Sequence, residues 1–260
     1  MYLNNKKIVI TGATSGIGKE LMKLLLKEKN NKIIAVGRNI EYIEKNSNII
    51  PYECDVSKKE NVDKMIEFIY SKYEKIDIFF ANAGYAKYGS FYKADWNKIE
   101  NMFSVNVFSP IYTLEKIKEK QKKIFIHYVV TASAVSFLTL PGFALYCSTK
   151  NALNTYFEAY KFEKDKNIKL SLVYPVATKT LFFKRAGNQI PIPFPLDSAE
   201  KVASAILREI EIGVEKIFPN KLFLIFCIIN RFLPFIGYLY QKIERFRFNL
   251  WRGRNEKIDT

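Results

Sequence analysis

Residues 7–18 read KIVITGATSGIG and decide the fold of this chain. The apolar run from Lys7 to Thr11 predicts a buried strand, and residues 16–29 predict a helix whose apolar face carries Ile17, Leu21, Leu24 and Leu25. The glycine-rich turn between them can bring backbone N–H groups and the positive end of a helix dipole against a pyrophosphate. We therefore expect a dinucleotide to contact Thr11, Gly12, Thr14, Ser15, Gly16, Ile17 and Gly18. The alternative is an ordinary glycine-rich turn.

Strands and helices alternate along the chain that follows. Further strands are predicted over 32–36, 49–52, 76–81, 124–131, 169–174 and 215–218, and helices over 60–73, 96–120, 149–164 and 198–212. This rhythm predicts an α/β fold with a doubly wound, Rossmann-type parallel sheet, formed by one domain over 1–219. The proline-rich segment 187–195 is expected to be a loop that covers the ligand site, and 220–260 a hydrophobic and basic tail.

The composition limits the partners of the protein. Lys and Arg outnumber Asp and Glu by 41 to 26, which gives a formal net charge of +15. We interpret this as a solvated lysine-rich surface, with a dinucleotide and an anionic membrane as the other candidates. We see no nucleic-acid recognition motif and expect no nucleic-acid partner.

The cysteines and the N-terminal segment bear on the compartment. Cys54, Cys147 and Cys227 lie far apart without metal-ligand spacing, so we expect neither a disulfide framework nor a metal site. Residues 1–7 are polar and lack the pattern of a signal peptide. A reducing, cytoplasmic location is the natural expectation.

The end of the second predicted strand bears on cofactor choice. An acidic residue there would bind the ribose hydroxyls of NAD, but the sequence is Val36-Gly37-Arg38-Asn39. A guanidinium at Arg38 suits a 2′-phosphate through charge-assisted hydrogen bonds. NADP(H) is therefore the preferred cofactor, with NAD(H) as the alternative if Arg38 is an ordinary exposed arginine.

Ser133, Tyr146 and Lys150 form a candidate catalytic set. Tyr146 and Lys150 are four residues apart and would share a helix face, where the ammonium should lower the pKa of the phenol. Ser133 follows the fifth strand at the edge where ligands bind, so its hydroxyl could hold a carbonyl oxygen that Tyr146 protonates. The single histidine, His127, lies within a predicted strand and is interpreted as structural.

Together these motifs resemble the short-chain dehydrogenase/reductase family over roughly the first 220 residues. The resemblance rests on the Thr-Gly-x-x-x-Gly-x-Gly turn, the Tyr-x-x-x-Lys pair and the Asn-Ala-Gly of Asn82, Ala83 and Gly84. Ala81 and Val176 depart from the family's usual Asn and Gly. The resemblance implies that Asn106 holds a water in a proton relay and that Lys150 binds the nicotinamide ribose. It also assigns cofactor contacts to Asp55, Asn82, Ala83, Gly84, Tyr146, Pro175 and Thr180.

By that resemblance the protein interconverts a carbonyl and a secondary alcohol and forms a homodimer or homotetramer through helices 96–120 and 149–164. The rival hypothesis is a non-catalytic NADP(H)-binding scaffold or sensor. A hydrophobic or lipid-like substrate is favoured by apolar residues around the catalytic segments, although core packing explains them equally: Phe137, Leu138, Leu140, Phe143, Leu145, Leu181, Phe182 and Phe183.

The tail carries a second signal. Residues 222–240 are strongly apolar, but Arg231 lies in the middle and Pro234 should kink a helix there. Basic and aromatic residues alternate beyond Tyr240, a composition that suits a membrane interface. We expect a tail that associates with the membrane surface; the alternative is a segment that caps the domain or packs in a dimer.

Overall fold

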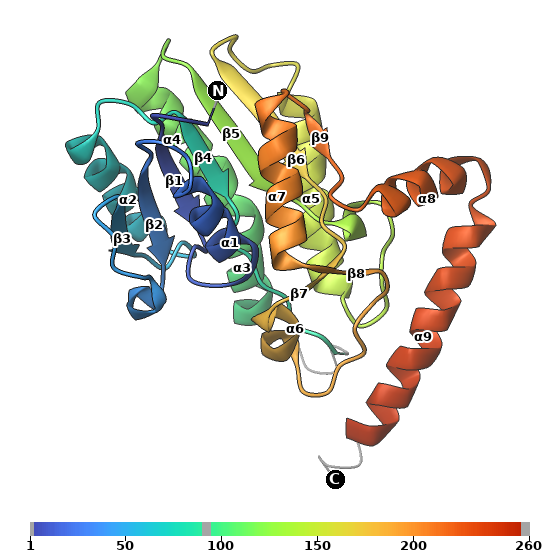
Figure 1. Cartoon of the computed structure of the whole chain (residues 1–260). Coiled ribbons are helices and arrows are strands. Elements are labelled where there is room, and N and C mark those ends of the chain that lie inside the picture. The colour runs from blue at the N-terminus through green and yellow to red at the C-terminus, as the bar shows by residue number, and fades with distance from the viewer. Residues whose placement is uncertain (1–2, 90–94, 256–260) are drawn as a thin grey trace.

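The computed structural model describes residues 3–89 and 95–255. Its centre is a parallel sheet of seven strands in the order β3-β2-β1-β4-β5-β6-β9 (Figure 1). The strands are β1 (Lys7–Thr11), β2 (Lys32–Gly37), β3 (Ile49–Glu53), β4 (Ile78–Ala81), β5 (Ile126–Thr131), β6 (Ile168–Val173) and β9 (Lys216–Ile217). The order reverses between β1 and β4, which confirms the predicted doubly wound, Rossmann-type sheet.

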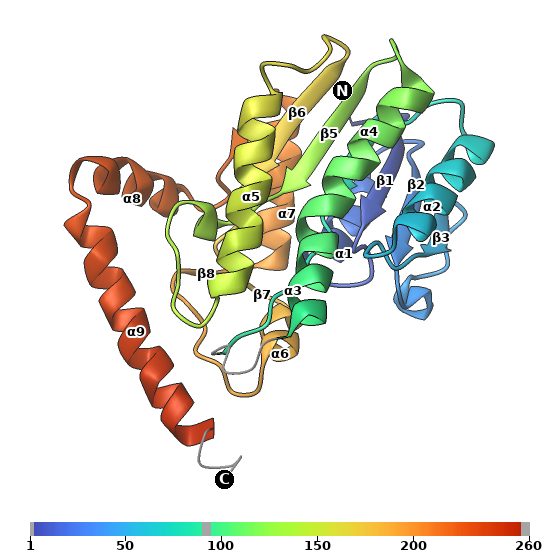
Figure 2. The ribbon, with the colours of Figure 1, turned by 180° about the vertical axis from the view of Figure 1, so that it is seen from behind.

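Helices cover both faces of the sheet (Figures 1 and 2). One face packs on α1 (Gly16–Leu25) and α7 (Ala199–Glu211), and the other on α2 (Lys59–Lys72), α4 (Ser109–Gln121) and α5 (Ala144–Tyr160). The side chains of β1 show why both faces need helices. Ile8 and Ile10 point to the face covered by α1 and α7, whereas Val9 points to the face covered by α2, α4 and α5. A strand that is apolar on both faces needs a cover on each side.

Several helix boundaries differ from the prediction. The helix predicted over 96–120 is a continuous run of three segments: α3 (Trp96–Phe103), a π-helical turn (Ser104–Phe108) and α4. The helix predicted from Thr149 begins at Ala144, two residues after Gly142, whose φ of +80° interrupts regular backbone. The first helix ends at Leu25 rather than near Lys29, because the Asn31 side chain donates to the Leu25 carbonyl oxygen (2.8 Å).

Short elements that the sequence did not predict lie between α5 and α7 and beside β2 and β5. They are η1 (Ile40–Tyr42), η3 (Ala134–Ser136), the paired strands β7 (Ala177–Lys179) and β8 (Leu196–Ser198), and α6 (Leu181–Ala186). Residues 187–195 connect α6 to β8 without helix or strand, as the prolines predicted.

The tail forms two helices, α8 (Lys221–Phe232) and α9 (Phe235–Asn255). The predicted kink at Pro234 is confirmed, because the chain direction bends by 115° between the two helices at that break. Among the described residues, no single helix has the length and hydropathy to cross a bilayer; α8 and α9 meet that criterion only as a bent pair. At its start α8 is tied to the domain, since Phe223 is buried in the core and Asn220 caps the helix at the Phe223 N–H (3.0 Å).

Candidate active site

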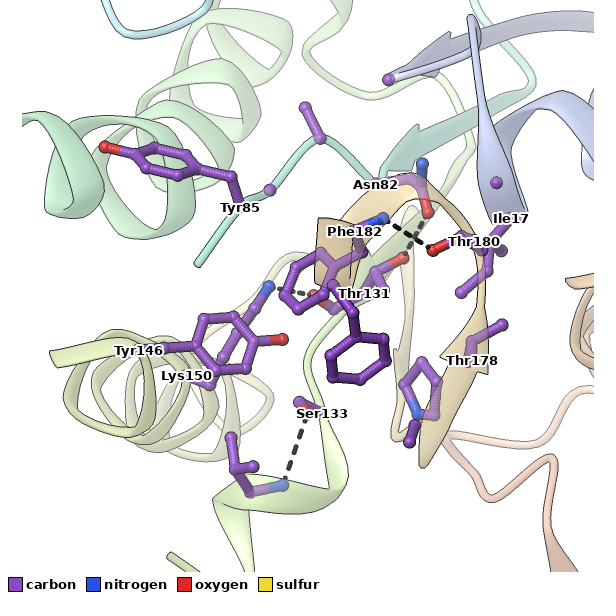
Figure 3. Close-up of a pocket in the computed structure, with 18 of the residues that line it drawn as sticks. Ile17, Asn82, Tyr85, Thr131, Ser133, Tyr146, Lys150, Thr178, Thr180 and Phe182 are labelled. Carbon is purple, nitrogen blue, oxygen red and sulfur yellow. Dashed lines mark hydrogen bonds between the residues drawn. The ribbon is translucent and has the colours of Figure 1, made fainter. Parts of the chain in front are cut away.

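A cavity of about 980 Å³ opens at the carboxyl ends of the parallel strands. Its walls come from the glycine-rich turn, the ends of β2, β4, β5 and β6, the start of α5, and the α6 region. Figure 3 shows Tyr146, Lys150 and Ser133 on one side of this cavity, and Ile17, Asn82 and Thr180 on the other. Open α/β sheets bind ligands at this edge.

The glycine-rich turn is built for close backbone approach. Gly12 and Gly16 have φ of +70° and +57°, which side-chain-bearing residues rarely adopt. At Gly18, a Cβ atom would collide with the carbonyl oxygen of Gly12, so only glycine lets the helix start this near the turn. The turn lines the cavity through Gly12, Thr14, Ser15, Gly16 and Ile17, which fits the expected dinucleotide contact.

Thr11 and Asn82 join the ends of three strands beneath the turn. Thr11 Oγ1 donates to the Phe80 carbonyl oxygen (3.2 Å) and accepts from the Asn82 and Ala83 N–H groups (3.0 and 3.1 Å). Asn82 Nδ2 donates to the Thr11 carbonyl oxygen (3.1 Å), while its Oδ1 accepts from Thr131 Oγ1 (3.2 Å). These two side chains therefore have a structural part in shaping the cavity floor.

Asn106 sits in the π-helical turn and is 1% exposed. Its Oδ1 accepts from the Tyr85 N–H (3.0 Å), and its Nδ2 donates to the Tyr85 carbonyl oxygen (2.9 Å) and to Thr149 Oγ1 (3.0 Å). The amide thus holds the segment after β4 against α5. Local π-helical geometry often marks functional positions.

Gly84 leaves a gap between two of the predicted residues. A Cβ atom there would lie 3.2 Å from Asn106 Oδ1 and 3.5 Å from Lys150 Nζ. Any side chain at this position would fill the space in front of both groups. The absence of a side chain at Gly84 therefore fits a nicotinamide ring and its ribose packed against this wall.

Lys150 is 3% exposed, and its Nζ donates to the Thr131 carbonyl oxygen (2.7 Å). Burial lowers its pKa to about 8, because a charged ammonium loses hydration inside the protein. Thr131 was not singled out in the sequence. Its role as the acceptor for Lys150 arises from contact across the sheet edge, which no local motif signals.

Tyr146 points into the cavity (Figure 3) and its ring centroid lies 5.9 Å from Lys150 Nζ. The sequence predicted that Lys150 lowers the pKa of this phenol, but the structure corrects this. Burial is the largest effect and raises the pKa of Tyr146, a hydrogen bond with Ser133 opposes it, and the Lys150 ammonium is directed at Thr131. The Ser133 oxygen accepts from the Val135 N–H (3.3 Å), which leaves its hydroxyl proton free to be donated.

The remaining predicted cofactor residues also line the cavity: Arg38, Asp55, Asn82, Ala83, Gly84, Pro175 and Thr180. Arg38 is exposed at the end of β2. Thr180 caps α6 by accepting from the Phe182 N–H (3.1 Å) and lies against Gly16. Arg185 also lines this part, with Nη1 3.4 Å from Ser15 Oγ, a contact that the sequence did not suggest.

The apolar residues expected in the substrate wall separate into two groups. Five line the cavity, namely Leu138, Leu140, Phe143, Phe182 and Phe183, whereas Phe137, Leu145 and Leu181 do not. Phe137 instead packs against Tyr174 and Phe218, with ring centroids 4.9 and 5.5 Å away. The tail supplies wall residues that the sequence analysis did not place there: Leu222, Phe223, Phe226 and Tyr240.

This arrangement defines a class of protein: an oxidoreductase of the Rossmann type with a Tyr-Lys pair facing its dinucleotide turn. The chain belongs to the short-chain dehydrogenase/reductase family, since a family model described as short chain dehydrogenase matches residues 6–190. The family resemblance in the sequence is thereby confirmed.

Curated relatives agree with this assignment. An uncharacterized oxidoreductase of Listeria monocytogenes is 31% identical over 194 residues, covering 69% of this chain and 77% of the relative. The 3-ketodihydrosphingosine reductase of Dictyostelium discoideum is 30% identical over 209 residues, covering 68% of this chain and 61% of the relative.

Solved structures share the fold. A short chain dehydrogenase from Burkholderia cenocepacia in complex with NADP has a TM-score of 0.77 at 20% identity, covering 89% of this chain and 94% of the other. One from Burkholderia phymatum in complex with NAD has a TM-score of 0.78 at 18% identity, with the same coverage. At such identities the likeness shows the fold alone.

Proposed function

We propose that this protein is an NADP(H)-dependent reductase that interconverts a carbonyl and a secondary alcohol. The observation that carries the proposal is the convergence of Ser133, Tyr146 and Lys150 on one wall of the cavity, opposite the glycine-rich turn. A substrate oxygen beside Tyr146 and a dinucleotide on the turn would share this one cavity.

The protein's part in the reaction is to hold the substrate oxygen and to move a proton. When bound, the reduced nicotinamide supplies the hydride that the carbonyl carbon receives. Tyr146 carries its proton at neutral pH, because burial raises its pKa, and donates it to the carbonyl oxygen. Ser133 donates a hydrogen bond to the same oxygen. Once that oxygen has become a hydroxyl, the Ser133 hydroxyl can donate instead to the phenolate left on Tyr146, a hydrogen bond that lowers the pKa of this phenol.

Asn106 is best placed as a positioning residue. Its amide is engaged with Tyr85 and Thr149, so it fixes the wall behind the nicotinamide site. The water relay that the family resemblance assigns to it stays a prediction. Lys150 as a ligand of the nicotinamide ribose is part of the same proposal.

Arg38 supports the preference for NADP(H). Its guanidinium lines the cavity at the end of β2, where a dinucleotide lying across the switch point would place its adenosine ribose. A 2′-phosphate there would gain a charge-assisted contact that an NAD ribose cannot offer. NAD(H) remains the alternative cofactor.

The apolar cavity wall favours a hydrophobic, lipid-like substrate. Phe143, Phe182 and Phe183 surround the Tyr146 side of the cavity, and the Dictyostelium relative is named a 3-ketodihydrosphingosine reductase. We also propose that the protein is cytoplasmic, associates peripherally with a membrane through 220–260, and forms a homodimer or homotetramer through α3–α4 and α5.

The test is NADPH oxidation by the full chain in mild detergent, with a panel of short- and long-chain ketones and with Tyr146→Phe alongside. We expect turnover that the variant loses while it retains NADPH binding, because only the proton donor is removed. Turnover that persists in Tyr146→Phe would contradict the mechanism. Tight NADPH binding with no turnover across the panel would favour the rival function, a non-catalytic NADP(H)-binding scaffold or sensor.

A further inference from the structure

Helix α9 lies at the side of the molecule opposite β3 (Figures 1 and 2). Its inner face is bound to the domain by hydrogen bonds and ring contacts. Four of its side chains donate to loop oxygens at 2.7–3.0 Å: Tyr240 to Phe194, Gln241 to Thr139, Arg247 to Ile192 and Trp251 to Asn188. Phe248 and Trp251 also pack edge-on against Tyr88. Three of the four acceptors lie in the proline-rich loop 187–195, so α9 is attached to the segment that borders the cavity.

The outer faces of α8 and α9 are apolar and exposed. The residues concerned are 42–75% exposed: Leu222, Ile225, Ile228, Ile229, Phe232, Leu233, Phe235, Tyr238, Leu239, Ile243, Phe246 and Leu250. On α9 the spacing of Phe235, Leu239, Ile243, Phe246 and Leu250 forms one continuous stripe. Exposed apolar surface on this scale marks a contact with a partner or a membrane.

The charge of the two helices favours a membrane over a protein partner as the contact of this apolar face. Between residues 221 and 255 the chain has seven Lys and Arg and one Glu, and that glutamate, Glu244, is buried and paired with Arg247. Lys221 is likewise paired with Glu209 of α7, so the net positive charge of the two helices comes from Arg231, Lys242, Arg245, Arg252 and Arg254. Apolar side chains flanked by this charge complement an anionic bilayer surface. With 12 residues, α8 is only about 18 Å long, too short to cross a hydrocarbon core of about 30 Å.

The same surface continues into the cavity. Leu222 is 73% exposed and Phe194 is 76% exposed, yet both line the cavity together with Phe226 and Tyr240. The Tyr240 hydroxyl donates to the Phe194 carbonyl oxygen and so joins α9 to this rim (2.7 Å). An acyl chain can therefore stay in contact with apolar side chains from the outer face of α8 to the Tyr146 side of the cavity.

We propose that α8 and α9 dock on an anionic bilayer and form the entrance through which a membrane-dissolved, long-chain ketone or alcohol reaches Tyr146. The proposal rests on the proposed function and adds the source and route of the substrate. Because the rim lies on the docking face, the substrate's apolar chain passes from lipid to protein without crossing water, which removes the cost of hydrating it.

The experiment uses the full chain, NADPH and two ketones, one short and water-soluble and one long-chain and dissolved in vesicles. Vesicles of phosphatidylcholine are compared with vesicles that also contain phosphatidylserine. The docking variant carries Ile243→Asp and Phe246→Asp, which lie on the outer stripe and outside the cavity wall. The control is Phe162→Asp, an equally apolar and exposed position beyond the far end of α5.

We expect the wild type and Phe162→Asp to cosediment with the phosphatidylserine vesicles and to reduce the long-chain ketone faster on them. The docking variant should bind these vesicles at least about tenfold more weakly and lose turnover of the long-chain ketone in proportion. The two aspartates oppose both the insertion of the α9 stripe into the bilayer and its attraction to anionic lipids. Its turnover of the short ketone should be unchanged, which also shows that it is folded. Leu222→Trp should raise the KM for the long-chain ketone while vesicle binding is retained.

Three outcomes would overturn the proposal. Equal turnover of the long-chain ketone with and without phosphatidylserine would contradict the proposed membrane entrance but would leave the proposed function intact. No turnover of either ketone would overturn the proposed function and the entrance that rests on it. A wild type that ignores vesicles, and whose oligomeric state in light scattering changes with the docking variant, would show that the outer face is a contact between copies of this chain.

Discussion

Lys150 combines a buried charge with a short hydrogen bond. Its Nζ is held by the Thr131 carbonyl oxygen, but one acceptor does not replace the hydration that the ammonium loses, so its pKa falls to about 8. The position therefore costs the protein stability at neutral pH and places a titratable amine beside Tyr146. Such perturbed groups are characteristic of active sites.

Stability should consequently depend on pH through Lys150. Its folded-state pKa lies below the ordinary value of 10.5, so between about 8 and 10.5 the unfolded chain binds more protons and stability rises with pH. Relative to Lys150→Met, the wild type should gain up to about 1.4 kcal/mol per pH unit in this window. Urea unfolding at several pH values measures this. The exposed Lys166→Met is the control, and an equal pH slope in both variants would contradict the assignment.

Arg38 tests cofactor choice at a single side chain. Arg38→Asp should raise the KM for NADPH by about tenfold or more and leave that for NADH unchanged or lowered, because a carboxylate repels a 2′-phosphate and accepts from ribose hydroxyls. Steady-state kinetics with both cofactors decide this. Lys166→Asp, at the opposite edge of the sheet, makes the same change of charge as a control. Equal effects of Arg38→Asp on both cofactors would refute the NADP(H) preference.

At the scale of elements, the π-helical turn is the feature that links the cavity to the helical layer. It joins α3 to α4 and aims Asn106 inward, where the amide bridges the segment after β4 and the first turns of α5. Because Asn106 is buried and its amide makes three hydrogen bonds, the turn depends on it.

Asn106→Ala should lower the free energy of unfolding by about 2–4 kcal/mol, since it leaves the Tyr85 N–H and carbonyl groups without their partner and removes one of the two hydrogen bonds of the Thr149 hydroxyl. It should also reduce kcat, because the wall at Gly84 loses its support. Chemical denaturation and NADPH oxidation measure the two effects. Asn97→Ala, an exposed position on α3 outside the cavity wall, should cost within about 0.5 kcal/mol. Similar losses for both variants would show that the π-helical turn does not rely on Asn106.

At the scale of the whole molecule, His127 lies in β5, an interior strand of the sheet between β4 and β6. Its Nε2 and Ser171 Oγ are 2.9 Å apart, and Ser171 donates to the Val214 carbonyl oxygen (2.7 Å), so Nε2 carries the proton in this pair. Burial, with a smaller effect of Lys169, lowers the pKa of His127 to about 3. This agrees with the prediction that the histidine is structural.

His127 should therefore make the protein acid-labile. Its folded-state pKa is below the ordinary value of 6.5, so stability is complete above pH 6.5 and falls with pH towards about 3, by up to about 1.4 kcal/mol per unit. His127→Gln should unfold with a shallower pH dependence in this range. Because the chain has one histidine, its imidazole NMR signal is unambiguous. Titration of that signal near pH 6.5 in the folded protein would contradict the burial argument.

The sequence by itself determined the sheet and the main catalytic candidates. The apolar runs at β1, β4, β5 and β6 and the glycine-rich turn could be predicted because strand burial and tight turns restrict the residue types at those positions. Tyr146 and Lys150 were predicted for a similar reason, since spacing along a helix fixes which side chains share a face. The proline at 234 located the bend in the tail because it cannot continue a helix.

Only the tertiary structure decided how these pieces act on one another. Thr131 meets Lys150 across 19 positions of sequence, Asn106 meets Thr149 across 43, and Trp251 meets the Asn188 carbonyl across 63. The direction of the pKa shift at Tyr146 and the place of the tail in the cavity wall also depend on such long-range packing. The physical reason is that local patterns report backbone geometry, whereas burial, hydration and contact between distant segments exist only once the chain has folded.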